Sequence, residues 1–283
     1  MSADTATTTT STASTWPGGY RAAAMVTINF DGESVEQREF AGQALWGKTA
    51  FGRYGAQVGV FRILEALARF DVRATFFIPG FDAERYPQAM AAIADGGHEV
   101  AGRGYAYEDF STLSAEQQEA VLERSEAAFE RVFGRRPLGW RAPEGLMTWE
   151  TRDLLARRGY TYDSTYCDDD LPYVVRSDAG DRIAELPHLH TSASDRHYYQ
   201  TWRQPWVVAE AWREELSATV EVGGLFNLAI HPRGDYGSGR AVRIRSVEAI
   251  LQTMHETPGL WVATGAEIAA HALAHAPERV PSP

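Results

Sequence analysis

Short apolar runs alternate with longer amphipathic stretches through most of the chain, and this alternation limits the folds open to it. Residues Ala23–Phe30 form an apolar run of strand length, whereas Gln57–Phe70 carries apolar residues at helical spacing. Strands that alternate with helices pair in parallel and carry their helices on the outside of the sheet. The sequence therefore predicts an α/β fold in which a single domain, residues 20–273, forms a distorted (β/α) barrel.

The same pattern predicts the chain ends and the remaining elements. Residues 1–19 are rich in Ser, Thr and Ala and lack the basic and apolar parts of a secretory signal, so we expect a disordered leader. Residues 274–283 are expected to form a flexible tail. Two long irregular segments, 32–55 and 167–202, are expected to shape access to a site. Further strands are predicted at 74–78, 98–101, 138–141, 161–163, 225–230 and 260–263, and helices at 82–95, 114–133, 148–158, 204–222, 246–256 and 266–273.

Composition excludes several classes of partner. The formal net charge of −11 argues against nucleic acid and anionic membrane surfaces. No apolar run is long enough to span a bilayer. The lone cysteine, Cys167, forms no intramolecular disulfide and fits a reducing compartment. We therefore expect a cytoplasmic protein that acts on a small molecule and uses neither nucleic acid nor membrane.

Polar residues follow the predicted strands at five places. The chemistry of a (β/α) barrel is located at the carboxyl ends of its strands. A residue able to carry charge lies at or just after a strand end in each of these places, which predicts one shared site. These residues are Asp31, Arg103, Arg141, Asp163 and His231.

The segment Gly97–Tyr107 reads G-H-E-V-A-G-R-G-Y-A-Y. It resembles the metal-site motif of the polysaccharide deacetylase family, also called NodB-homology domains or carbohydrate esterase family 4, which typically reads G-H-E-[IV]-x-x-H-x-x-x-H. In that family the last two histidines bind a divalent metal. Arg103 and Tyr107 stand at these two positions, and arginine stays protonated and cannot ligate a metal. The resemblance thus predicts a NodB-type barrel whose metal site is lost and which needs no cofactor.

Further motifs support the resemblance in the family's order. Asn29–Glu33 resembles the segment that begins with the catalytic base, and Gly139–Pro143 resembles the R-x-P motif. Asn227–Pro232 resembles the strand that carries the catalytic histidine, and residues 261–269 match the closing segment. Residues 162–165 and 169–173 are typical of the allantoinase-like and cyclic-imidase-like branch. Together these matches cover most of the chain.

The resemblance implies hydrolysis of a carbon–nitrogen bond other than a peptide bond. It implies that Asp31 is the general base, that His231 is the general acid and that Arg141 orients Asp31. Glu33 falls where some members bind their metal, and we expect it to pair with Arg103. Arg103 and Tyr107 would then take over the electrostatic role of the metal and stabilise an oxyanion. An amide or imide in a small ring is the expected substrate.

Loop residues beside these motifs are candidates for substrate binding. Four aromatic residues and two residues of the R-x-P segment are predicted to line the pocket. Three histidines, His188, His190 and His197, lie close together but lack a recognisable spacing of metal ligands. The predicted substrate-binding residues are Trp46, Tyr54, Tyr105, Pro143, Glu144 and Tyr173.

Other functions remain open from the sequence. Arg103 is either a cation that replaces the metal or a plug in an inactive site. The same groups can serve a non-hydrolytic acid–base enzyme, such as an isomerase, lyase or cyclase of specialised metabolism. A pseudoenzyme that binds a ligand is a third alternative. A homodimer or homotetramer is expected from the resemblance alone.

Overall fold

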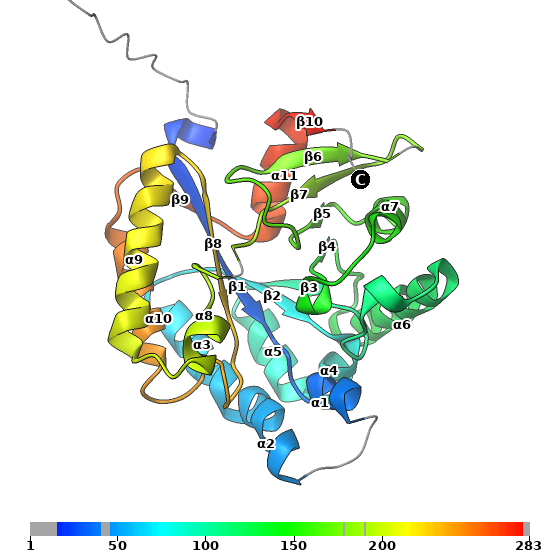
Figure 1. The fold of residues 1–283 in the computed structure, drawn as a ribbon, viewed down its shortest axis with the longest axis horizontal. Coiled ribbons are helices and arrows are strands. Elements are labelled where there is room, and N and C mark those ends of the chain that lie inside the picture. The colour runs from blue at the N-terminus through cyan, green and yellow to red at the C-terminus, as the bar shows by residue number, and fades with distance from the viewer. Residues whose placement is uncertain (1–15, 41–45, 178, 190, 280–283) are drawn as a thin grey trace, which may run out of the picture.

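The computed structural model describes residues 16–40, 46–177, 179–189 and 191–279. Within these ranges, ten strands form a single curled sheet in the order β10-β6-β7-β5-β4-β3-β2-β1-β8, with β9 paired to the start of β1 (Figure 1). Among the described strands, only β6 and β7 pair in antiparallel fashion. This curled, open sheet confirms the predicted distorted barrel. The strands are β1 Ala22–Asn29, β2 Thr75–Ile78, β3 Glu99–Gly102, β4 Gly139–Trp140, β5 Tyr162–Asp163, β6 Tyr173–Arg176, β7 Arg182–Glu185, β8 Leu225–Ile230, β9 Leu260–Val262 and β10 Glu278–Arg279.

Helices pack around the outside of the sheet. Figure 1 shows α3, α9 and α10 grouped beside β1 and β8, while α6 and α7 lie toward β3 and β4. None of the described helices has the length and apolar character needed to cross a membrane. The helices are α1 Ser34–Glu39, α2 Trp46–Tyr54, α3 Val60–Arg69, α4 Gly80–Arg85, α5 Pro87–Asp95, α6 Ala115–Phe133, α7 Trp149–Arg157, α8 Asp195–Gln200, α9 Pro205–Val222, α10 Ile244–Glu256 and α11 Gly265–His275, with short helical turns at Pro17–Gly19, Gly55–Gly59, Phe110–Thr112 and Pro143–Gly145.

Alternation along β1 separates the core from the site. Val26 and Ile28 belong to the large apolar cluster that also contains residues of α3, α9 and α10. Met25 belongs to a second cluster, on the opposite face of the strand. Farther along that face, Thr27 and Asn29 are buried polar residues. The inner face of the sheet therefore changes from apolar to polar toward the carboxyl ends of the strands.

The helix predicted over 82–95 is two helices. Tyr86 separates α4 from α5, and Pro87 begins α5. Proline lacks a backbone N–H and disfavours helical geometry in the residue before it, so a continuous helix ends here. The predicted single helix was wrong for this reason.

The two predicted irregular segments contain regular structure. Helices α1 and α2 lie in the first, and β6, β7 and α8 lie in the second. A π-helical turn, Gly55–Gly59, follows α2 and brings its backbone against the loop after β8. A Cβ atom at Gly59 would lie only 2.0 Å from the carbonyl oxygen of Pro232. Glycine is thus required there, and the turn supports the loop that follows His231.

Regular structure extends beyond residues 20–273 at both ends of the described part of the chain. Trp16 is buried, and its indole Nε1 donates to the carbonyl of Gly223 at 2.8 Å, so order begins before residue 20. At the other end α11 continues to His275, and β10 pairs with β6. Residues 1–15 of the predicted leader and residues 280–283 of the predicted tail lie outside the described ranges.

Candidate active site

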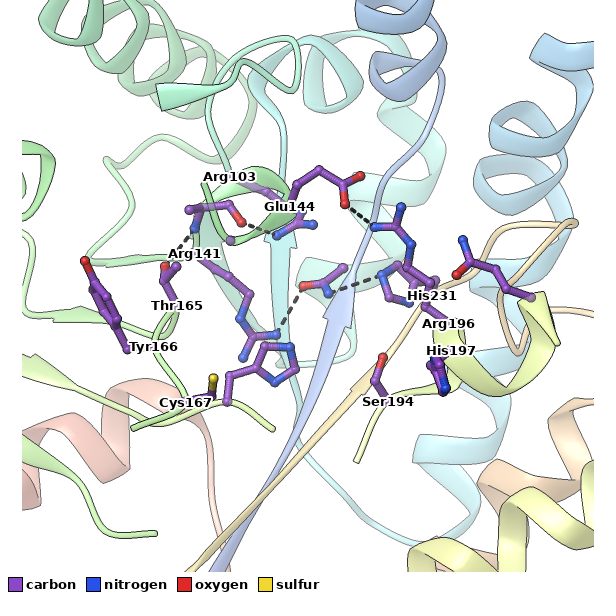
Figure 2. Close-up of a pocket in the computed structure, with 15 residues that line it drawn as sticks. Arg103, Arg141, Glu144, Thr165, Tyr166, Cys167, Ser194, Arg196, His197 and His231 are labelled. Atoms are coloured by element: carbon purple, nitrogen blue, oxygen red, sulfur yellow. Dashed lines mark hydrogen bonds and ion pairs between the residues drawn. The ribbon is translucent and has the colours of Figure 1, made fainter. Parts of the chain in front are cut away.

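A cavity of about 510 Å³ opens at the carboxyl ends of the inner strands (Figure 2). The strands β1, β3, β4 and β8 all border this cavity, because a side chain at or just after the end of each strand lines it. Four of the five strand-end residues considered above converge here, and Asp31, Arg103 and His231 contact one another directly or approach within ion-pair distance. The lining residues are Asn29, Arg103, Arg141, Ala142, Glu144, Gly145, Thr165, Tyr166, Cys167, His188, Ser194, Arg196, His197, Gln200 and His231.

A buried ion pair joins Asp31 and Arg103. The Nε of Arg103 donates to Asp31 Oδ1 at 2.6 Å, and its Nη2 donates to Oδ2 at 3.2 Å. Burial acts to raise the pKa of Asp31, but the charge of Arg103 and its hydrogen bond outweigh it and lower this pKa to about 2. The expected pairing of Arg103 with Glu33 was therefore wrong. Asp31 is the counter-ion of Arg103, and its low pKa makes it a weak proton acceptor.

The loop after β1 holds Asp31 in an uncommon backbone conformation, with φ at 30°. Asp82 accepts hydrogen bonds from the backbone N–H groups of Gly32 and Ser34. Arg233 donates from Nη1 to the carbonyl oxygens of Asp31 and Gly32 at 3.1 and 3.0 Å. Buried polar groups on both sides of the loop thus fix the backbone that presents the Asp31 carboxylate.

Tyr107 extends the ion pair toward the cavity. Its hydroxyl lies 3.1 Å from Asp31 Oδ2 and 3.0 Å from Glu144 Oε1, so its single proton has two carboxylate acceptors. Glu144 in turn accepts from Arg196 Nη1 at 2.6 Å. Burial and the charge of Asp31 raise the pKa of Tyr107 well above its usual range. Tyr107 therefore stays protonated and is available as a hydrogen-bond donor.

His231 is held from both ring nitrogens. Its Nδ1 lies 2.6 Å from Asp195 Oδ1, and its Nε2 lies 3.2 Å from Asn29 Nδ2 and 3.6 Å from Asp31 Oδ2. Arg141 donates to Asn29 Oδ1, which fixes the orientation of the Asn29 amide. Because the amide nitrogen only donates, Nε2 must accept and Nδ1 carries the proton. The network thus favours the Nδ1–H tautomer, in which Nε2 accepts from Asn29 and faces Asp31.

Arg141 does not contact Asp31, contrary to the role that the resemblance implied. Its guanidinium donates to Thr27, Asn29, Ser164 and Asn227, which are all neutral acceptors. Burial and the nearby charge of Arg103 lower its pKa to about 9. Arg141 acts on the site through Asn29, which it orients toward His231.

Glu33 lies apart from the cavity. Its carboxylate pairs with Arg53, with 2.6 Å between Arg53 Nη2 and Glu33 Oε1, and also with Arg85. Although burial acts to raise the pKa of Glu33, hydrogen bonds from Arg53 and Arg85 lower it. These partners direct the side chain away from Asp31, and we correct its assignment to the site.

Most of the predicted aromatic residues also lie elsewhere. Tyr54 contacts Arg62 and Arg240, Tyr105 donates to Glu84, and Tyr173 donates to Asp168. These polar partners hold the three rings outside the cavity lining. Trp46 begins α2, but its side chain lies outside what the structure describes. Glu144 does line the cavity, whereas Pro143 is its buried neighbour in a short turn.

Several residues of the site were not predicted from the sequence, and most of them lie in the segment 164–197. Asp195 and Arg196 open the short helix α8, and Thr165 donates from its hydroxyl to the buried Asp163 at 2.5 Å. The only sequence signal was the polar run Ser194–His197 in a long segment. His188 and His197 line the cavity, and His190 lies outside the described residues. Asp163, which we expected at the site, is buried behind Thr165 and does not line the cavity.

The donor set does not fit a divalent metal. Both oxygens of Asp31 are engaged by the Arg103 guanidinium, which would also repel a cation. Glu33 points away, and Tyr107 remains protonated. Within the described ranges, no group of three or more His, Cys, Asp or Glu side chains is arranged to hold a metal ion.

The Asp31 pair predicts a pH dependence of stability. Because the pKa of Asp31 is lowered from 3.8 to about 2 on folding, its contribution is present above about pH 4 and is lost as the pH falls toward 2. The free energy of unfolding of the wild type should therefore fall more steeply over this range than that of Asp31→Asn. Urea titrations at several pH values measure both slopes. Equal slopes would show that Asp31 is not the stabilised carboxylate.

Comparisons with known proteins agree with this fold. Residues 54–162 match the family model described as polysaccharide deacetylase. A crystal structure from Mycobacterium smegmatis, named a polysaccharide deacetylase, is 34% identical with a TM-score of 0.87, over 95% of this chain and 96% of its own. The PuuE allantoinase structure has a TM-score of 0.79 at 23% identity over 92% of each chain, which supports the fold alone.

A peptidoglycan deacetylase from Helicobacter pylori is 34% identical over 138 residues, which are 48% of this chain and 46% of its own length. This chain spans less than half the length of the curated relatives that it matches. The Mycobacterium smegmatis protein, in contrast, matches nearly end to end. The family match and this full-length likeness agree with the strand-end motifs, and the chain belongs to the polysaccharide deacetylase family.

Proposed function

We propose that the protein is a hydrolase that cleaves a carbon–nitrogen bond of a small cyclic amide or imide without a divalent metal. The observation that carries this proposal is the position of His231. Its basic nitrogen is oriented by Asp195 and Asn29, faces Asp31, and lies at a cavity with Tyr107 and Arg103 nearby. A volume of about 510 Å³ suits a small molecule.

His231 replaces Asp31 as the general base in this proposal. A carboxylate with a pKa of about 2 that is bound by Arg103 accepts a proton from water poorly. His231 Nε2 instead takes the proton as the water oxygen bonds to the carbonyl carbon. The resulting imidazolium is stabilised by Asp195 at Nδ1 and by Asp31, which lies 3.6 Å from Nε2.

The tetrahedral intermediate needs a donor for its oxyanion. Tyr107 supplies one when its hydroxyl turns from Glu144 or Asp31 to the substrate oxygen. The charge of Arg103 is largely balanced by Asp31, so the main role of Arg103 is to hold Asp31 and Tyr107 in place. When the carbon–nitrogen bond breaks, Nε2 returns its proton to the leaving nitrogen. His231 thus serves as base and then as the general acid that we expected from the sequence.

We expect His231→Asn to lower kcat/KM by at least about a thousandfold, because one imidazole carries both proton transfers. The assay uses cyclic imides, hydantoins and N-acetyl compounds in the presence of EDTA, with ¹⁸O-labelled water to show hydrolysis in the product. His255→Asn, at an exposed position on α10, is the matched control and should keep full activity. Activity that persists in His231→Asn, or that EDTA abolishes in the wild type, would contradict the proposal.

The closed Asp31–Arg103 pair also favours a second candidate, a non-catalytic binding protein, because each group neutralises the other. A non-hydrolytic acid–base enzyme would use the same imidazole. Product free of ¹⁸O supports the acid–base enzyme. Ligand binding without turnover, unchanged in His231→Asn, supports the binding protein.

A further inference from the structure

Three arginines line the cavity. Arg103 is paired with Asp31, Arg196 with Glu144, and His231 with Asp195. Arg141, in contrast, is buried among neutral acceptors in the region that the structure describes. An arginine at a cavity can bind an anion where its guanidinium is exposed and keeps N–H groups that no carboxylate engages.

Arg196 is the arginine best placed to contact that ligand. Its side chain is 31% exposed, whereas those of Arg103 and Arg141 are buried. Its guanidinium carbon lies 4.9 Å from the centre of the Tyr236 ring, which supports the planar group from one side. Among the described residues Glu144 is its single ion-pair partner, through Nη1. The remaining N–H groups match the two oxygens of a carboxylate.

Glu144 already occupies the position that such a ligand would take. Its Oε2 accepts from Arg196 (Figure 2). Its Oε1 accepts from the Tyr107 hydroxyl, so one carboxylate bridges the cavity mouth and the site. Its backbone has φ at 54°, and its side chain is 28% exposed. A partly exposed side chain on a short turn can leave Arg196 at small cost when another carboxylate replaces it.

We propose that Arg196 binds a carboxylate of the substrate, which displaces Glu144 as its counter-ion. This inference rests on the proposed function for the scissile bond and adds that the substrate is anionic. Displacement of Glu144 also releases one of the two acceptors of Tyr107. Binding of the anion thereby frees the Tyr107 hydroxyl for the substrate carbonyl.

The test compares hydantoin-5-acetate with hydantoin-5-acetamide, which differ only in the charge of the side group. Dissociation constants are measured by titration calorimetry in the His231→Asn background, so that turnover does not interfere. We expect the carboxylate to bind at least about tenfold more tightly, since a hydrogen bond to a charged group has roughly this effect. Arg196→Met should remove the preference. Glu144→Gln should strengthen it, because the competing internal carboxylate is gone.

Arg203→Met removes an exposed arginine just beyond α8 and is the matched control, expected to keep the wild-type preference. Equal affinities for the two compounds, a preference that survives Arg196→Met, or no saturable binding of the carboxylate would overturn the inference. Turnover separates the two proposals. If binding depends on Arg196 but the wild type hydrolyses neither compound, the proposed function fails while the anion site stands.

Discussion

Arg103→Met is expected to lower the free energy of unfolding by about 3–5 kcal/mol, the usual effect of removing one partner from a buried ion pair. Both side chains are almost fully buried, at 4% exposure for Arg103 and 0% for Asp31. Without the guanidinium, the partners that remain to the Asp31 carboxylate among the described residues are the Tyr107 hydroxyl and the more distant His231. Chemical denaturation followed by circular dichroism measures the change.

A double-mutant cycle shows whether the loss comes from the pair itself. Asp31→Asn combined with Arg103→Met removes both charges and should recover some of the lost stability. Arg38→Met breaks the exposed pair with Asp109 and should cost at most about 1 kcal/mol. If Arg103→Met is as mild as Arg38→Met, the Asp31–Arg103 pair does not hold the site together.

Asp195→Asn is expected to lower kcat/KM roughly a hundred- to ten-thousandfold while leaving KM little changed. Asp195 accepts the Nδ1 proton of His231, and an asparagine amide at this position can present a donor instead and select the wrong tautomer. The imidazolium formed during proton transfer would also lose its closest negative charge. Steady-state kinetics on any compound that the wild type hydrolyses gives the value.

Ser238→Ala provides the control for Asp195. The Ser238 hydroxyl donates to Asp195 Oδ2 at 2.8 Å, whereas the backbone contacts to the same carboxylate remain in the variant. The variant perturbs the support of Asp195 but keeps the contact with His231, so its activity should fall much less. An Asp195→Asn enzyme that folds normally and retains wild-type kcat/KM would show that Asp195 has no role in proton transfer.

The fold could be predicted from the sequence because its main strands and helices have clear patterns. β1 and β8 are apolar runs of strand length, and α6 begins with the capping box of Ser114 and Gln117. The hairpin of β6 and β7 was missed. Its two four-residue strands lie within a long segment rich in polar and turn-forming residues, where no periodicity stands out.

The strand-end part of the site was predictable in its positions but not in its pairings. The strand ends placed Asp31, Arg103 and His231 together, since parallel strands end at one edge of the sheet. Which carboxylate Arg103 selects depends on the direction of each side chain, and the sequence does not give that direction. Asp195 lies 36 residues before His231 on a short helix, so nothing local indicated their contact. Side-chain partnerships across long separations need the three-dimensional structure.

The Asp31–Arg103 pair also limits how such a site can change over generations. Arg103 stands where the resemblance places a metal-binding histidine, and it pairs with Asp31, the carboxylate that the resemblance assigns as the base. A single exchange of Arg103 for a neutral residue leaves a buried charge without its partner, and the intermediate form is expected to be unstable. An exchange of Arg103 for a metal ligand is therefore expected to cost stability unless Asp31 changes with it. The buried ion pair thus couples the two positions, so that neither is replaced alone without loss.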